Sequence, residues 1–437
     1  MQSRNMREQL QRVLRTPEVL FIGINGVVGG GIFLLPGQVA QSAGAAAVWA
    51  YLAAGFVVVL IGLSFAEVST MYDRTGGPLV YADEAMGKTA GFTVGWMVWV
   101  TYLIGWSVLS DGFVSYLGSL WTPARTYEAP IIIALVAALC LINTIGVRLG
   151  SGVIGFFTVA KLIPLALLIV AGLTFAGASG NAALELVPSG SGDFFGAVLL
   201  IIFAYGGFEG ATIPAGEMRN PRRTISIAVL GTLAGVTLFY MLIQYAALRI
   251  EPGLAGTETP LASAGEAMFA GGLAIMTVGA LLSIFGTQSG LALISPRNLY
   301  GLSREGMLPG VLGRVHPRFR TPVVSIWLTG ALVVLLGVTG TFAQLVLLNV
   351  AARLYQYLMV CLSVVVLRLR DPEAERPFRL PLGFTIPAAA TILCVLLLTQ
   401  QPLVNLLAAL GALAVGLVLY AISRYGASAA RSSHSVE

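Results

Sequence analysis

Four ionisable side chains stand inside long apolar runs of this sequence, namely Asp111, Lys161, Glu209 and Arg353. A charge at the centre of a membrane-spanning helix costs at least about 2.5 kcal/mol on insertion scales. Each residue therefore needs a partner, a ligand or a proton to exchange. A desolvated lysine can release its proton during a cycle, whereas an arginine stays charged and pairs with a carboxylate. The set predicts ion pairing and proton transfer inside a bundle of helices.

Two apolar runs also crowd glycine into their middle, GINGVVGGGIF at 23–33 and FAYGGFEGATIPAGE at 203–217. Each glycine in a helix interior costs about 1 kcal/mol, so the three consecutive glycines at 29–31 should interrupt the first helix. Close helix packing of the GxxxG kind, through Gly26 and Gly30, is the alternative. The pairing of two such runs favours interruption, because interrupted segments in corresponding halves indicate a binding site at the bilayer midplane.

An interrupted helix leaves backbone groups that are tolerated in a membrane only where they line a cavity or meet a ligand. The half-helix that begins near Gly31 presents free N–H groups and a positive dipole end, which suit a carboxylate. The half-helix that ends near Tyr205 presents free carbonyls, which suit an ammonium. A ligand with both groups on one carbon satisfies both ends. The backbone therefore predicts an α-amino acid and leaves its side chain open.

The composition requires a membrane for these elements. The chain has 437 residues, of which 57% are hydrophobic and 10% are charged, whereas a soluble domain has about 25% charged residues. Soluble, disordered and nucleic-acid-binding classes are excluded. The continuous runs favour helices over a barrel, and the length allows about twelve spans. The expected spans are 19–41, 44–71, 90–118, 129–147, 151–177, 194–217, 225–248, 270–302, 323–339, 342–369, 384–400 and 402–424.

Basic residues predict the orientation of these spans. The outer loops hold only Arg125 and Arg249, and the other basic residues outside the spans fall in inner segments. Both termini are therefore expected in the cytoplasm, and the protein in the cell inner (plasma) membrane. The apolar run from Val19 lacks a clear cleavage site and is interpreted as a retained first span.

Motifs along the chain add a family likeness. They are GGGIFLLPG (29–37), AKLIPL (160–165), FAYGGFE with GEMRNPRRTI (203–209 and 216–225), YGLSREGMLP with VHPRFRTPV (300–309 and 315–323), and RPFRLP (376–381). In this order they resemble segments of the amino acid–polyamine–organocation (APC) superfamily, in particular its prokaryotic cationic and neutral amino acid transporters. The likeness covers about residues 18 to 382, and its specificity comes from the order of the motifs.

The resemblance implies an all-α polytopic fold with a five-plus-five inverted repeat, two added helices, and interrupted first and sixth helices. It places the first repeat at 1–177, the second at 194–369, the added helices at 384–424 and a cytoplasmic tail at 425–437. It implies secondary transport of amino acids or related amines. The implied substrate contacts are Gly29, Gly30 and Gly31 for the carboxylate, and carbonyls around Ile24, Phe203, Ala204 and Gly206 for the amine.

The resemblance also implies roles for the charged residues. Lys161 matches the place where sodium-coupled relatives hold a cation between the first and eighth spans, with Thr287 as a neighbour. Glu209 matches a glutamate that some members use for gating and proton linkage. Proton coupling by Lys161 stands beside a second interpretation, in which the ammonium is a permanent tether to carbonyls of the interrupted first span.

Arg353 occupies nearly the same place in the tenth span as Lys161 in the fifth. The repeat would therefore turn it toward the sixth and third spans, which carry Glu209 and Asp111. Pairing with Glu209 is preferred because the two lie at similar depth. Direct contact of Arg353 with an acidic substrate remains an alternative. For Asp111 the alternatives are a bond within the bundle, the outer vestibule, or a cationic substrate.

Other polar and aromatic residues have plainer interpretations. Glu67 and Glu217 lie near inner span ends and are expected to pair with inner-loop arginines, with an inner gate as the alternative. The third span carries Trp96, Trp99, Tyr102 and Trp106, which most simply pack or anchor at an interface, although one ring could close over a substrate.

Three function classes compete. The first is an amino acid transporter coupled to protons, and the second is an amino acid or polyamine exchanger without such coupling. The site has few anionic side chains, which favours neutral amino acids over polyamines. The third class, an intramembrane enzyme, lacks HExxH and GxSxG motifs and a membrane-embedded histidine. The three cysteines have no metal-ligand spacing, so no metal is expected. The expected partners are an amino acid, protons and lipid, with no cofactor and no nucleic acid.

Overall fold

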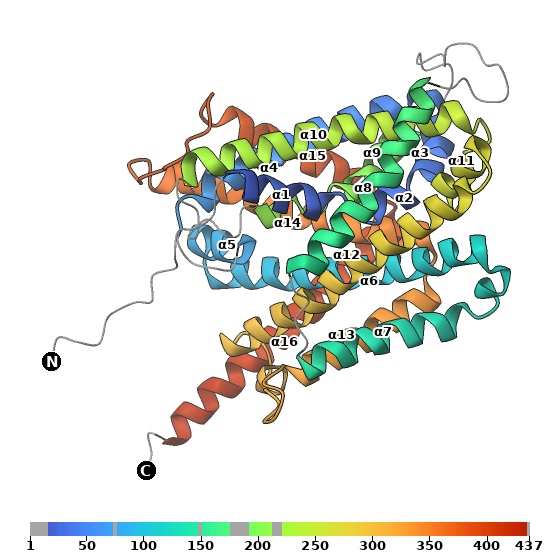
Figure 1. The fold of residues 1–437 in the computed structure, drawn as a ribbon. Helices are drawn as coiled ribbons and strands as arrows, with labels where there is room; N and C mark the ends of the chain where they lie inside the picture. Colours follow the sequence, from blue (N-terminus) through green and yellow to red (C-terminus); the bar gives the residue numbers. More distant parts are fainter. Residues whose placement is uncertain (1–15, 73–76, 147–150, 175–191, 212–220, 435–437) are drawn as a thin grey trace.

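The computed structural model describes residues 16–72, 77–146, 151–174, 192–211 and 221–434. Within these ranges every regular element is a helix (Figure 1). Seven helical segments are long and apolar enough to cross a bilayer. They are Pro36–Ser69, α6 (Lys88–Leu120), α7 (Glu128–Ile145), Ile227–Ile250 within α10 (Pro221–Ile250), α12 (Gly272–Arg304), α14 (Phe342–Arg370), and Leu403–Tyr425 within α16 (Leu403–His434). The fold is that of a polytopic membrane protein.

Shorter helices complete the bundle. The segment Pro36–Ser69 consists of α3 (Pro36–Ala43), η1 (Gly44–Ala46) and α4 (Ala47–Ser69). The other short apolar helices are α1 (Thr16–Val27), α2 (Gly31–Leu34), α8 (Ser151–Thr174), α9 (Phe194–Ala204), α13 (Val323–Thr339) and α15 (Thr385–Thr399). Each expected span coincides with one or more of these helices.

Some elements differ from the expectation. Two short helices, α5 (Pro78–Met86) and α11 (Pro260–Met268), lie at opposite ends of the bundle (Figure 1). Each begins with proline, which is pre-organised for the first helical position. Each is too short to cross a bilayer. At the C-terminus, α16 continues to His434, so most of the expected tail at 425–437 is helical.

The helix α6 forms the centre of the bundle. It is buried along nearly its whole length and packs against α5, α12, α13 and α14. A second contact joins α8 to α12, where Pro164 lies in the space that a side chain at Gly279 would fill. By contrast, α16 exposes many of its apolar side chains at the edge of the fold (Figure 1), as expected for a surface that faces lipid.

Both predicted interruptions are present. The helix α1 ends at Val27 and α2 begins at Gly31. The helix α9 ends at Ala204, and the 3-10 helix η3 begins at Phe208 and ends at Ala211. Between α9 and η3, Gly207 adopts a positive φ of 111°, a conformation that glycine takes without strain. The glycine clusters thus stop the helices where the sequence predicts.

Candidate functional site

The two interruptions lie against each other. A Cβ atom added to Gly26 would lie 2.9 Å from the carbonyl oxygen of Gly207, and one added to Gly207 would overlap the carbonyl oxygen of Gly26. Only glycine therefore permits this backbone contact between the end of α1 and the end of α9. The contact brings the ends of two helices together at one point inside the bundle.

A cavity of about 110 Å³ opens at this point. It is lined by the interruptions and by faces of α6, α12 and α14. The lining residues are Gly26, Val27, Gly29, Gly30, Gly31, Thr101, Tyr102, Gly105, Leu109, Phe203, Ala204, Gly206, Gly207, Glu209, Thr287, Leu291 and Arg353. Six of the seven predicted substrate contacts are among them.

The exception is Ile24. Its carbonyl oxygen accepts the N–H of Val28 at 2.8 Å, so the helical ladder of α1 uses this group. Gly26 and Val27, one turn closer to the break, line the cavity instead. The close packing that the GxxxG spacing suggests is also present, because a Cβ on Gly30 would lie 2.6 Å from Leu109 and 2.9 Å from Ile284.

Carbonyls at the end of α1 are held by side chains from other helices. Lys161 Nζ donates to the carbonyl oxygen of Asn25 at 3.0 Å. The hydroxyl of Tyr240, from α10, donates to the carbonyl oxygen of Val27 at 2.9 Å and also lies 3.2 Å from that of Ala204. These contacts satisfy groups that a helix end leaves unpaired, and Tyr240 joins both interruptions.

Lys161 is buried and also donates to the side-chain Oδ1 of Asn25 at 2.8 Å. Its positive charge therefore lies at the C-terminal end of α1, where the helix dipole favours a cation. The predicted neighbour Thr287 lines the cavity beside Gly29. Its hydroxyl donates to the carbonyl of Ser283 at 2.8 Å within α12. The hydrogen bonds of Lys161 go to Asn25 and not to Thr287.

Arg353 and Glu209 are brought together on the cavity wall. Arg353 Nη1 lies 3.5 Å from Glu209 Oε1, and both side chains are buried. Glu209 Oε2 accepts the N–H of Gly207 at 3.0 Å and the hydroxyl of Tyr357 at 3.5 Å. The guanidinium fills the space that a side chain at Gly206 would need. A buried arginine thus closes one side of the cavity.

Asp111 lies elsewhere. Its Oδ1 is 3.9 Å from Nη1 of Arg125. Arg125 is the last residue of the 3-10 helix η2 (Thr122–Arg125). Arg125 also lies 3.7 Å from Glu128 and pairs with Glu258. Asp111 does not line the cavity. Of the two carboxylates expected near Arg353, the structure therefore pairs Glu209 with it and pairs Asp111 with Arg125.

The aromatic residues of α6 divide into two groups. Trp96 Nε1 donates to the carbonyl of Ala412 in α16 at 2.8 Å, and Trp99 Nε1 to the hydroxyl of Thr329 in α13 at 3.2 Å. These rings pack helices together. Tyr102 lines the cavity and is the ring of this group that a ligand would meet.

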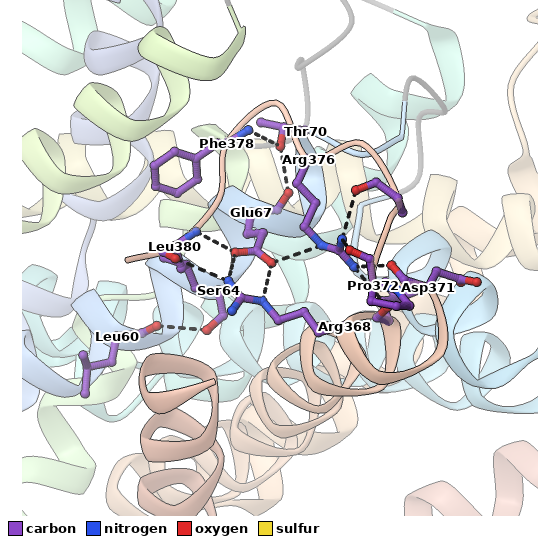
Figure 2. Close-up of polar contacts among 12 residues, drawn as sticks. Leu60, Ser64, Glu67, Thr70, Arg368, Asp371, Pro372, Arg376, Phe378 and Leu380 are labelled. Atoms are coloured by element: carbon purple, nitrogen blue, oxygen red, sulfur yellow. Dashed lines mark hydrogen bonds and ion pairs between the residues drawn. The ribbon is translucent and has the colours of Figure 1, made fainter. Parts of the chain in front are cut away.

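A second buried charge cluster joins α4 to the loop after α14. Glu67 accepts Nε of Arg368 at 2.8 Å and the backbone N–H of Leu380 at 2.7 Å, and Arg376 Nε lies 3.6 Å from it (Figure 2). The loop folds over the carboxylate, whose side chain is 1% exposed. Glu67 therefore pairs with arginines as expected; Glu217 lies outside the described residues.

Tyr240 and Asn25 are site residues that the sequence reasoning missed. Tyr240 stands in the apolar run VTLFYMLIQY, which also carries the hydroxyls of Thr237 and Tyr245. A buried hydroxyl needs a partner, but the run does not show which hydroxyl reaches the helix breaks. Asn25 directly precedes the predicted break. Among the described residues, no group of three or more His, Cys, Asp or Glu side chains could hold a metal ion.

Membrane-length helices around a small cavity at two helix breaks define a polytopic membrane protein with an internal site. The family model described as amino acid permease matches residues 14–422. The chain therefore belongs to the amino acid permease family of the APC superfamily, and it is a membrane transporter and not an enzyme.

Individual relatives have low sequence identity to this chain, but the similarity covers most of both proteins. The branched-chain amino acid permease BcaP of Bacillus subtilis is 26% identical, covering 94% of this chain and 93% of that protein. The methylthioribose transporter of the same organism is 27% identical over the same shares. The serine/threonine exchanger SteT, also of Bacillus subtilis, is 31% identical, covering 85% of this chain and 86% of that protein.

Proposed function

We propose that this protein is a secondary active transporter that carries a neutral amino acid across the cytoplasmic membrane by alternating access. The observation that carries the proposal is the cavity at the contact between the two helix interruptions. Backbone of this kind is tolerated at membrane depth where it lines a cavity or binds a ligand. Family membership and relatives named for amino acids support the substrate class.

In this proposal the substrate spans both breaks. Its carboxylate lies at the N–H groups of Gly29, Gly30 and Gly31, where α2 begins. Its ammonium lies at the α9 end, near the carbonyls of Phe203, Ala204 and Gly206. Both ends line the cavity, and the dipoles of the two helix ends have the signs that a zwitterion requires.

The arrangement of charges supports the twofold repeat, with repeats at 1–177 and 194–369 and added helices at 384–424. Lys161 of α8 bonds Asn25 at the end of α1. Arg353 of α14 pairs with Glu209 just after the end of α9. In each half, a cation on the last helix of the repeat thus holds the interrupted first helix of the same repeat.

Lys161 and Glu209 are the proposed coupling and gating groups. Both are buried beside an interruption, so a change of protonation at either would alter how firmly a mobile half-helix is held. The test uses Lys161→Ala in liposomes. We expect it to lose accumulation driven by a pH gradient while it keeps exchange of labelled for unlabelled substrate. Undiminished accumulation by Lys161→Ala would remove the coupling role.

An amino acid exchanger without proton coupling is the second candidate. The two bonds of Lys161 to Asn25 favour it, because they are what a permanent tether would make. A polyamine substrate is less well supported: Glu209, the carboxylate that lines the cavity, is paired with Arg353. We further propose that the protein spans the plasma membrane several times and has both termini in the cytoplasm.

Uptake by purified protein in liposomes tests the function directly. We expect saturable uptake of labelled neutral L-amino acids, stimulated by unlabelled amino acid on the other side. Uptake that rises linearly without saturation would indicate a channel. Stimulation by polyamines alone would overturn the proposed substrate class.

A further inference from the structure

The buried pair on the cavity wall is not equally satisfied on its two sides. Glu209 accepts hydrogen bonds from Gly207 and Tyr357. Arg353 Nε and Nη1 are buried, and neither has a hydrogen-bond partner among the residues that the structure describes. Nη1 faces Glu209 only at 3.5 Å. A guanidinium is a source of donors with no acceptor of its own, so the arginine on this wall carries two nitrogens whose N–H groups remain unused.

An unused buried donor has a cost that a ligand can remove. Arg353 lines the cavity together with Gly206, whose missing side chain makes room for the guanidinium. Both lie on the same cavity as the helix breaks at Gly29–Gly31 and Ala204. An amino acid held at the breaks would therefore present its side chain to the walls that include Arg353.

The charge of the pair limits what the side chain can be. Arg353 and Glu209 together are neutral, so a ligand carboxylate would leave one negative charge unbalanced in a low-dielectric interior, which is costly. An ammonium would meet the guanidinium. A neutral acceptor, such as a hydroxyl or an amide oxygen, satisfies the free donors without an excess of charge.

The cavity also limits size. A buried water needs about 10–15 Å³ of such space, so about 110 Å³ holds on the order of seven to eleven atoms of that size. Serine, threonine and asparagine fit this limit, whereas tryptophan exceeds it.

We infer that Arg353 is a specificity-determining residue that donates to a neutral acceptor on the side chain of a small polar amino acid. The inference rests on the proposed function, since it assumes that the backbone at the breaks holds the α-amino and α-carboxyl groups. It concerns the side chain alone. A pair of isosteric ligands with and without the acceptor therefore isolates it.

The experiment measures the affinity of purified full-length protein for threonine, valine, asparagine, leucine and glutamate. We expect threonine to bind at least about tenfold more tightly than valine, and asparagine more tightly than leucine, because an analogue without the acceptor leaves the arginine unpaired. In the double variant Arg353→Gln/Glu209→Gln, which removes both charges and replaces the guanidinium by a shorter amide, the threonine-to-valine ratio should fall about tenfold, mainly through weaker threonine binding.

Outcomes that overturn the inference differ from those that overturn the proposed function. Valine binding as tightly as threonine, or glutamate binding more tightly than asparagine, would refute a neutral acceptor at Arg353 while amino acid binding stands. An unchanged ratio in the double variant would do the same. No binding of any α-amino acid would instead refute the proposed function. If the double variant does not fold, judged by gel filtration, the ligand ratios of the unmodified protein still decide.

Discussion

Gly26 at the end of α1 and Gly207 after the end of α9 lie in direct backbone contact. The two residues are far apart in the chain, and each belongs to a different interrupted helix. Their contact joins the breaks into a single site, because residues of both breaks line one cavity. The transport proposal depends on this contact.

A methyl group at Gly26 should separate the two breaks. In Gly26→Ala the new Cβ would lie 2.9 Å from the Gly207 oxygen, which is backbone and cannot rotate away. We expect substrate affinity to fall at least about tenfold, since misplacement of binding groups by about 1 Å is costly. The matched control is Gly290→Ala in α12, where nothing lies within 4 Å of the added Cβ. Equal affinities for the two variants would contradict the contact.

The hydroxyl of Tyr240 should stabilise the breaks themselves. Tyr240→Phe removes the donor to the carbonyl of Val27 and leaves a buried carbonyl without it. We expect a loss of about 1–3 kcal/mol of stability, measured as a lower melting temperature in detergent, and weaker substrate binding. Tyr51→Phe is the control: its buried hydroxyl has no hydrogen-bond partner in the described part of the chain. A larger loss in Tyr51→Phe than in Tyr240→Phe would refute this role.

Glu67 should carry a large share of the stability where α4 meets the loop after α14. Glu67→Gln leaves Arg368 and Arg376 without their carboxylate (Figure 2). Breaking one side of a buried ion pair costs about 3–5 kcal/mol, so we expect a clear fall in melting temperature. Glu266→Gln, at an exposed position of α11, should leave it unchanged. A double-mutant cycle of Glu67 and Arg368 that shows no coupling would rule out the pair.

The sequence predicts the helices and their breaks well because hydrophobic runs and glycine clusters act locally. Apolar length places α6, α12 and α14 within a few residues, and Gly29–Gly31 marks the first break. Depth along the membrane also carries information: Arg353 and Glu209, at similar depth in their helices, meet.

Features that depend on helix rotation or tertiary packing are harder to predict. Thr101, Gly105 and Leu109 follow one another at four-residue spacing on the cavity face of α6, and residues at this spacing share a helix face. Asp111 is off that face and pairs with Arg125. The contribution of Tyr240 depends on where α10 packs, which no local pattern shows.

A binding panel tests most directly whether the two helix breaks together hold a zwitterion. Thermal shift of purified protein is measured with threonine, with the amine that lacks its carboxyl group, and with the acid that lacks its amino group, because a binder raises stability by mass action. We predict a shift for threonine alone at concentrations where neither analogue gives one. A shift of the same size for either analogue would show that only one break takes part and would contradict binding of the substrate across both breaks.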